Sequence, residues 1–338
     1  MANYVLKRFA EWTDKERTRV NQFILDKSTN GEFIHSLTFL EYHPQGRFQD
    51  DSIAVIDSEC GNIMGVMMAA INPNDKDCII SHPGTTFAGP VVKNGVAINA
   101  KEKVINMLLD YYESKYSSIW IKTVPIIYTE QCYGSIAYFL IKRGYIESMA
   151  ALANVVNVSK YVKEEEIFKL YHSKRRNQIK KALSSKIFIL EKSDKIRQDV
   201  WDRMRDNLRK KFNSQPTHSY EEMCDLLERC PNYIKVYYVS TNDGDYGAFA
   251  VVFRFKNVFH TQYLDTNYDY TGQYPNLYLI HHLLLEAGKE GYSFLSFGAS
   301  TENGGRYLNE GLYNYKAEYG GGDIILPLYR KDIGEKKQ

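Results

Sequence analysis

The chain has 338 residues, of which 44% are hydrophobic and 25% are charged, a composition typical of a globular protein rather than a disordered one. That length suits two domains of ordinary size. The formal net charge of +2 excludes a global electric field that would attract nucleic acid or an anionic membrane. Any affinity for a polyanion must therefore come from a local patch.

The cysteines and the N-terminal segment indicate in which cellular compartment the protein is located. Five dispersed cysteines without a C-x-x-C pair favour reduced thiols in a cytoplasm over a disulfide framework. The segment MANYVLKRFAEWTDKERTRV is charged from its start and lacks the apolar core of a signal peptide. No apolar run in the sequence approaches the roughly 20 residues that span a bilayer. We expect a soluble, cytoplasmic protein without a membrane span.

The first half of the chain alternates between strand and helix patterns, as a mixed α/β unit does. A strand at 3–9 precedes an amphipathic helix at 13–27, and a strand pair at 52–71 turns at SECGN. The segments expected next are a strand at 77–82, a helix at 100–116, a strand at 118–128, a helix at 134–145 closed by Gly144, and a strand at 149–158.

The second half repeats this order of elements. The offset between matching positions drifts from 184 residues, between Tyr4 and Phe188, to 176 residues, between Gly144 and Gly320. Any α/β chain aligns loosely with itself, but this ordered drift favours a true duplication of a unit with mixed sheets. The expected segments are a strand at 186–193, a helix at 195–212, a strand pair at 234–255, a strand at 257–265, a helix at 276–291, a strand at 292–298 and a helix at 310–320.

A linker helix is predicted between the copies, at 161–185, with an acidic start and a basic end that suit the helix dipole. Such a charge run is usually a solvated helix face. Cations without an interleaved acid can also bind phosphate oxygens through charge-assisted hydrogen bonds. The cations within two turns are Lys174, Arg175, Arg176, Lys180 and Lys181.

Four stretches carry a resemblance to a known family: YHSKRRNQIKKAL, FHTQYLDTN and FLSFGASTENGGRYLNEGLYNYKAEYGG in the second half, and IISHPGTTFAGPVV in the first. They are similar to the tandem GNAT-fold acyltransferases related to the Fem-type (FemAB-like) peptidyltransferases of bacterial cell-wall synthesis. The resemblance spans nearly the whole chain. It implies an N-terminal GNAT-like domain at 1–160, the basic linker helix at 161–185 and a C-terminal GNAT-like domain at 186–338.

The sequence departs from the Fem pattern in three respects. Ser296 stands in LSFGAS where Fem-type enzymes commonly have an aspartate, the first-half motif is AGP rather than paired glycines, and a long coiled-coil arm is missing. These departures favour relatives that resemble acyl-CoA-dependent N-acyltransferases of surface-polysaccharide or cell-envelope synthesis. The resemblance thus implies acyl-CoA as cosubstrate. However, residues 265–278, where GNAT enzymes usually hold the CoA pyrophosphate, lack a glycine-rich signature.

Lys316 lies in an aromatic helical turn that runs into Gly320–Gly322. Leu312, Tyr315 and Tyr319 share one helix face, and Lys316 lies beside that face. A lysine at this place can simply extend its amine to solvent. The resemblance places the matching lysine in the active-site channel and implies that Lys316 stabilises a tetrahedral oxyanion or a donor phosphate, with Tyr315 as a substrate contact.

The strand FHTQYLD supplies further candidates. Strand alternation places His260 and Gln262 on one face and Tyr263 and Asp265 on the other. His260 can accept the proton of an amine near neutral pH, although a lone strand histidine is more often structural. Asp265 and Glu318 are the rival bases, and Gln262 and Tyr263 are candidates for substrate binding.

The loop at 298–309 follows a strand whose carboxyl end is a usual place for ligands in α/β folds. Ser300 and Asn309 can bond an acceptor's hydroxyls, but such residues are equally common in turns and helix N-caps. The adjacent His281 and His282 diverge on a helix and cannot ligate one ion, so the sequence predicts no metal site.

The leading hypothesis is an enzyme, an N-acyltransferase that moves an acyl group from acyl-CoA to an amine acceptor such as an amino sugar or a nucleotide-linked sugar. Lys174, Arg175 and Arg176 would then contact donor or acceptor phosphate. One alternative is Fem-type aminoacyl transfer from charged tRNA, which the net charge of +2 does not favour. The other is a non-catalytic GNAT-like scaffold.

Overall fold

The computed structural model describes residues 3–131, 133–148, 151–161 and 163–334. Two compact units make up the chain: the first unit is Met1–Ala151, Asn303–Tyr307 and Ile325–Gln338, and the second unit is Leu152–Glu302 and Leu308–Ile324. Met149 and Ala150 of the strand expected at 149–158, and Cys132, lie outside the described residues. In the described part of the chain, no helix is long and apolar enough to cross a membrane.

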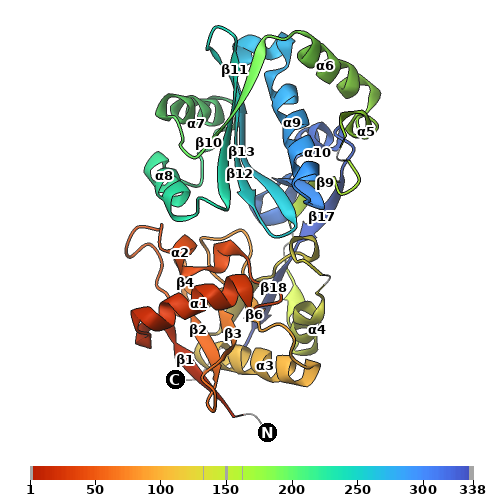
Figure 1. Cartoon of the computed structure of the whole chain (residues 1–338). Helices are drawn as coiled ribbons and strands as arrows, with labels where there is room; N and C mark the ends of the chain where they lie inside the picture. The colour runs from red at the N-terminus through yellow and green to blue at the C-terminus, as the bar shows by residue number, and fades with distance from the viewer. Residues whose placement is uncertain (1–2, 132, 149–150, 162, 335–338) are drawn as a thin grey trace. The chain divides into compact units, whose positions relative to one another are not determined.

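The first unit contains a four-stranded and a five-stranded sheet (Figure 1). The order of the four-stranded sheet is β1 (Tyr4–Arg8), β2 (Ile53–Asp57), β3 (Ile63–Met67) and β6 (Pro90–Val92). The order of the five-stranded sheet is β4 (Ala70–Asn72), β5 (Asp75–Ile80), β7 (Ser118–Lys122), β18 (Leu328–Asp332) and β8 (Ile146–Glu147). Its helices are α1 (Asp14–Asp26), α2 (Leu37–Leu40), α3 (Ile98–Lys115) and α4 (Ser135–Lys142).

The second unit is built on one seven-stranded sheet in which β13 and β14 pair in parallel. Figure 1 shows α7 (Gln198–Phe212) and α8 (Tyr220–Arg229) on one face, and α6 (Ser173–Ser184) and α9 (Pro275–Lys289) on the other. The strand order is β10 (Phe188–Ser193), β11 (Ile234–Thr241), β12 (Tyr246–Arg254), β13 (Val258–Thr266), β14 (Phe294–Ala299), β9 (Ala151–Asn157) and β17 (Gly322–Leu326). Further elements of the chain are α5 (Glu164–Ile167), α10 (Glu310–Ala317) and the short pair β15 (Thr301–Glu302) and β16 (Tyr307–Leu308).

The two halves of the sequence exchange strands. β9, from the end of the first half, pairs antiparallel with β14 in the second unit. β18, from the end of the chain, pairs antiparallel with β7 in the first unit, where Tyr329 is 5% exposed. The division into units therefore differs from the expected ranges 1–160 and 186–338, because the five-stranded and the seven-stranded sheets each contain a strand of the other half.

Some expected elements differ from those observed, among them the linker helix and one strand of the first half. The expected linker helix at 161–185 is instead two helices, α5 and α6, separated by a turn in which Tyr171 is buried against α9. The strand expected at 118–128 ends at Lys122, and a 3-10 turn occupies Ile126–Tyr128. Pro125 cannot donate a hydrogen bond to a neighbouring strand, so the strand pattern cannot continue through it.

Both units carry the same short parallel ladder. Val258, Phe259 and His260 of β13 pair with residues 294–296 of β14. In the first unit, residues 78–80 of β5 pair with residues 118–120 of β7. The ladders differ beyond their last pair: in the first unit the Ala88 amide donates to the Lys122 carbonyl oxygen over 2.7 Å, and Ala88 forms a parallel bridge with Thr123. The segment after β5 thus returns to pair with the end of β7.

Candidate active site

The candidate active site lies where β13 and β14 diverge. Their ladder ends at the pair His260–Ser296, although β13 continues for six more residues, to Thr266. The first four residues of β13 are buried and the last five are half-buried. Ligands of open α/β sheets bind beyond the carboxyl ends of parallel strands, especially where neighbouring strands separate. The backbone therefore marks this divergence as a place for a ligand.

Lys316 of α10 is buried at this divergence, with 7% of its surface exposed. Its Nζ donates to the carbonyl oxygens of Gly298 (3.1 Å) and Ala299 (2.7 Å) at the end of β14. Gly298 has a φ of 69°, and the pairing of β14 with β9 is irregular between Ser296 and Ala299. Burial lowers the pKa of Lys316 to about 8, so this cation is close to its titration point at neutral pH.

His260 lies next to this lysine. Its Nδ1 is 3.1 Å from the Ser296 hydroxyl oxygen, and a Cβ placed on Gly298 would come within 3.4 Å of its ring. Burial, and secondly the charge of Lys316, lower the pKa of His260 to about 4. The imidazole is neutral at pH 7 and is a weak base there, which favours a hydrogen-bonding role over the proton-accepting role expected from the sequence.

A β-bulge changes the faces on which the β13 side chains lie. His260 pairs with Phe253 of β12, and the register shifts so that Tyr263 pairs with Val251 and Asp265 with residue 249. Directly paired residues point to one face, and alternate residues of β12 share a face. His260, Tyr263 and Asp265 therefore share a face, contrary to the strict alternation expected. An extra residue in the strand, Gln262, accounts for the difference.

Tyr263 and Asp265 are both held by α7 and the segment after it. The Tyr263 hydroxyl accepts from the backbone amide of His218 (3.2 Å) and lies 2.6 Å from His218 Nδ1. Asp265 accepts from Asn207 Nδ2 (3.0 and 3.2 Å) and from the Tyr246 hydroxyl (2.8 Å). Burial raises the pKa of Tyr263 to about 12 and raises the pKa of Asp265 above its usual value.

The structure does not bring the three predicted cations of α6 together. Lys174 is exposed, whereas Arg175 is buried, forms an ion pair with Glu318 and lies over the rings of Tyr315 and Tyr319 at 4.9 and 5.1 Å. Arg176 donates to the carbonyl oxygens of residues 168 and 171. Arg175 and Arg176 thus use their guanidinium groups to hold α6 in place.

Three other predicted residues make internal hydrogen bonds. The Ser300 hydroxyl is buried and donates to Asn154 Oδ1 of β9 over 2.6 Å. The Asn309 side chain accepts from the Leu312 amide over 3.0 Å and caps α10. The Tyr315 hydroxyl accepts from Asn276 Nδ2 over 2.9 Å, which ties α10 to the first turn of α9. Each of these contacts helps to fix the backbone around Lys316.

Sequence reasoning missed His218 and Asn207. Neither belongs to a recognisable motif, and the helix after His218, α8, was not predicted. A signal for α8 does exist in the sequence: Ser219 and Glu222 form a capping box, with the Glu222 carboxylate accepting from the Ser219 amide. Such a signature would have placed His218 just before a helix.

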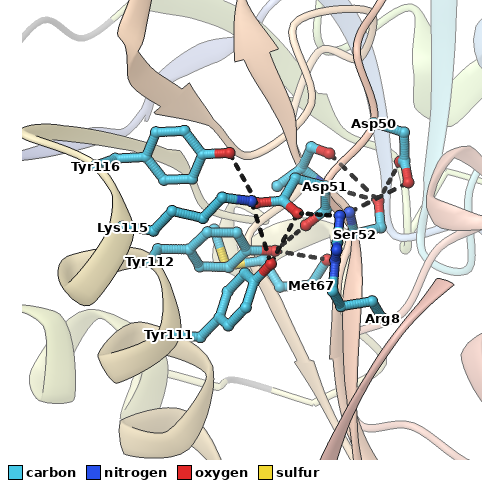
Figure 2. A network of polar contacts seen from close by, with 10 residues as sticks. Arg8, Asp50, Asp51, Ser52, Met67, Tyr111, Tyr112, Lys115 and Tyr116 are labelled. Carbon is cyan, nitrogen blue, oxygen red and sulfur yellow. Dashed lines mark hydrogen bonds and ion pairs between the residues drawn. The ribbon is translucent and has the colours of Figure 1, made fainter. Parts of the chain in front are cut away.

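A second polar cluster lies in the first unit around the buried carboxylate of Asp51 (Figure 2). The hydroxyls of Tyr111 and Tyr116 each donate to it over 2.8 Å, and Lys115 Nζ forms an ion pair with it at 2.7 Å. Arg8 lies 3.5 Å from the oxygen that accepts from Tyr111. These donors come from α3, from Tyr116 directly after it and from β1, and they leave the carboxylate well satisfied, so we interpret the cluster as a structural tie between α3 and the strands.

Known proteins show what this arrangement is similar to. Residues 172–317 match the acetyltransferase (GNAT) domain family. The crystal structure of FemX superposes with a TM-score of 0.68 at 12% identity, over 97% of this chain and 96% of FemX. A tandem GNAT protein from the clavulanic acid biosynthesis pathway gives 0.54 at 10% identity, over 99% of this chain and 100% of that protein. L-PGS from Bacillus licheniformis gives 0.53 at 9% identity, over 83% of each chain. A search of curated proteins finds no match.

The comparisons confirm the expected α/β class with two GNAT-like domains and mixed sheets. The matched stretch contains β13, β14, α9 and Lys316, so the divergence lies inside the part of the chain that matches the acetyltransferase family. Residues 172–317 thus match the acetyltransferase (GNAT) domain family, and the fold of the whole chain is similar to that of FemX and of a tandem GNAT protein.

Proposed function

We propose that the protein is an N-acyltransferase that moves an acyl group from acyl-CoA to the amine of an amino sugar or a nucleotide-linked sugar. The observation that supports this most strongly is the buried Lys316 at the divergence of β13 and β14, within the acetyltransferase domain. A buried cation close to its titration point, at the carboxyl ends of two strands, suits a site that stabilises developing negative charge.

The donor would lie along β13 past the last ladder pair. There the strand edge that faced β14 no longer takes part in the ladder, and the pantetheine arm of acyl-CoA carries amides that can pair with a strand. The following segment leads to the first turn of α9, which begins at Pro275. A helix N-terminus favours negative charge, so the donor phosphates would lie near this turn.

The reaction would need no covalent enzyme intermediate. The amine nitrogen attacks the thioester carbonyl, the N–C bond forms and the C–S bond breaks. Of the two protons that the ammonium group loses, one goes to the departing thiolate and one to solvent. Lys316 would stabilise the oxyanion, and neutral His260 would orient the reacting groups by hydrogen bonding.

The reaction belongs, in this proposal, to a reducing compartment such as the cytoplasm. The described cysteines Cys60, Cys78, Cys224 and Cys230 are free thiols, and two of them are buried. Dispersed free thiols are typical of proteins that work in a reducing environment.

The first experiment is calorimetric titration of the full chain with acetyl-CoA, followed by measurement of thiol release with glucosamine as acceptor. Lys316→Ala should reduce kcat by about 10²–10³-fold, the usual cost of losing one oxyanion-stabilising group. Lys316→Arg should retain more activity, because it keeps the charge but not the geometry.

A matched control is Lys289→Ala, which removes an exposed lysine at the other end of α9 and should leave kcat unchanged. Equal activity of Lys316→Ala and the wild type would remove Lys316 from the mechanism. Absence of both acetyl-CoA binding and thiol release would overturn the acyl-CoA donor and leave charged tRNA as donor or a scaffold role.

A further inference from the structure

We infer that the ammonium group of the acceptor binds on the α7 face of β13, with the carboxylate of Asp265 as its counter-ion. The inference rests on the proposed function only where it identifies the bound amine as the acyl acceptor. The binding of an ammonium group itself depends only on the contacts of the site. It assigns the second unit a cation-binding position that is separate from the buried Lys316.

Two bulges create this position. In β12 the pairing with β11 shifts between Val239 and Ser240, where Gly247 is the extra residue. In β13 the extra residue is Gln262. The first bulge brings Tyr246, and the second brings Asp265, onto the face that α7 covers, where the Tyr246 hydroxyl donates to the Asp265 carboxylate.

Asp265 follows Tyr263 on the same face of β13, and His260 lies on that face at the divergence itself. Successive same-face positions on a strand are about 7 Å apart. Asp265 is two such steps, about 14 Å, from His260, so an acceptor whose ammonium group lies at Asp265 would lie beside the stretch of β13 along which the donor would bind. The acceptor approaches from the α7 face, while α9 covers the opposite face.

The Asp265 carboxylate is held in place by neutral donors. Asn207 bonds both of its oxygens and Tyr246 bonds one of them. Within the described ranges, no lysine, arginine or histidine forms an ion pair with it. Arg203 is exposed, and its guanidinium lies over the Tyr246 ring at 5.6 Å, so it contributes charge from a distance rather than a direct contact.

A half-buried carboxylate without a direct counter-ion is destabilised by its loss of solvent. An ammonium ligand would supply the missing charge and hydrogen bonds. Tyr263, on the same face of β13 as Asp265, packs edge to face with the buried Trp201, with ring centroids 5.1 Å apart, which fixes the wall of this position. The alternative, that Asp265 only ties α7 to the sheet, uses the same hydrogen bonds but predicts no response to an amine.

The test uses the full chain without any acyl donor and compares two sugars. Glucosamine carries an ammonium group, and N-acetylglucosamine has the same ring without that charge. Glucosamine should bind saturably to the wild type, and N-acetylglucosamine should not bind. Asp265→Asn should weaken glucosamine binding at least tenfold. Asp269→Asn, which changes an exposed aspartate four residues further along, should bind like the wild type.

A measurement on the wild type covers the case in which Asp265→Asn does not fold. In protein with carboxyl-labelled aspartate, saturating glucosamine should lower the pKa of Asp265, measured by NMR, because an ammonium neighbour favours the charged carboxylate. Undiminished glucosamine binding in Asp265→Asn, no glucosamine binding by the wild type, or an unchanged Asp265 pKa would each overturn the inference.

A separate titration with acetyl-CoA keeps the two proposals apart. Glucosamine binding without acetyl-CoA binding would remove the proposed donor and leave the ammonium site standing. Acetyl-CoA binding without glucosamine binding would do the reverse, because the donor site would stand and Asp265 would lose its assigned role.

Discussion

Lys316 uses two of its three N–H groups on the carbonyl oxygens of Gly298 and Ala299, which leaves one for a substrate oxygen. Its position on α10 is fixed by the Asn309 cap and by the bond between Tyr315 and Asn276. Asn309 and Tyr315, which the sequence suggested as substrate contacts, therefore also have a structural role, because they orient the helix that carries Lys316.

The pKa of about 8 for Lys316 leads to a prediction for the pH dependence of turnover. The lysine is charged below that pKa and neutral above it, so kcat should fall as the pH rises through about 8. In Lys316→Arg the side chain stays charged well above pH 10, so the fall in kcat should lie above the measured pH range. The measurement is kcat for thiol release between pH 6 and 10. The same fall in both proteins would assign it to another group.

His260 leads to a prediction for stability in acid. Its pKa is about 4 in the folded protein, against about 6.5 in an unfolded chain. The unfolded state binds the proton first, so the free energy of unfolding should fall as the pH drops from 6.5 towards 4, by up to about 3 kcal/mol for this residue. In His260→Gln the fall should be smaller. Urea titrations at several pH values measure it.

His172 provides the control for this experiment, because it is an exposed histidine of the same unit. His172→Gln should keep the wild-type dependence on pH. If His260→Gln also kept it, the proton that destabilises the fold would bind elsewhere.

At the scale of single elements, β13 shows where sequence reasoning reached its limit. The strand itself was predicted from its composition, and His260 and Asp265 were chosen from it. The bulge was not predicted, because Gln262 has no glycine or proline beside it that would mark one. A one-residue insertion reverses the faces of all residues after it, so the grouping of Asp265 with His260 depended on pairing that only the structure shows.

β18 supplies a prediction at the same scale. Tyr329 of this strand is buried in the core of the first unit, although it stands near the end of the chain. Tyr329→Ala should lower the free energy of unfolding by about 3 kcal/mol, as losses of large core side chains do. It should also speed amide exchange in β7, the strand that pairs with β18. Urea unfolding and hydrogen exchange measure the two effects.

Ile325→Ala is the matched control, since Ile325 lies four residues earlier and is 53% exposed. It should change stability by only a few tenths of a kcal/mol. Faster exchange in β14 rather than β7 after Tyr329→Ala would contradict the strand exchange.

At the scale of the whole molecule, the duplication predicts two similar units, but only one of them has an open divergence among the residues that the structure describes. In the first unit, the Ser81 amide donates to the Trp120 carbonyl oxygen over 2.9 Å, and Ala88 pairs beyond it with the end of β7. Lys122, whose pKa burial lowers to about 8, donates to the carbonyl oxygen of Thr85 in the same segment. The chain itself fills the place that a donor would take.

We therefore expect one molecule of acyl-CoA to bind per chain. Calorimetric titration with acetyl-CoA should give a stoichiometry of one, and Lys316→Ala should alter the enthalpy of that single site. A stoichiometry of two would show that the segment between β5 and β6 leaves its place when a donor arrives. Displacement of bound acetyl-CoA by free CoA gives an independent measure of the number of binding sites.

The repeat in the sequence was enough to predict a doubled α/β fold, because matching elements recur in the same order. The repeat could not predict that β9 and β18 pair with strands of the other half, because the partner of a strand is decided by tertiary packing and not by local sequence pattern. The same holds for the site: Lys316 was found from its unusual helix, whereas Asn207 and His218 are defined only by what they contact.

The exchange of strands also has a consequence for how the chain folds while it is being synthesised. Ser118 of β7 bonds Asp332 of β18 across 214 positions of sequence. When the first half of the chain has emerged from the ribosome, β18, which lies between β7 and β8 in the sheet, has not yet been synthesised. Until the last strand arrives, those strand edges are open to pairing with other chains. The protein should therefore be most prone to aggregate late in its translation, and a chaperone that covers strand edges should raise its yield most at that stage.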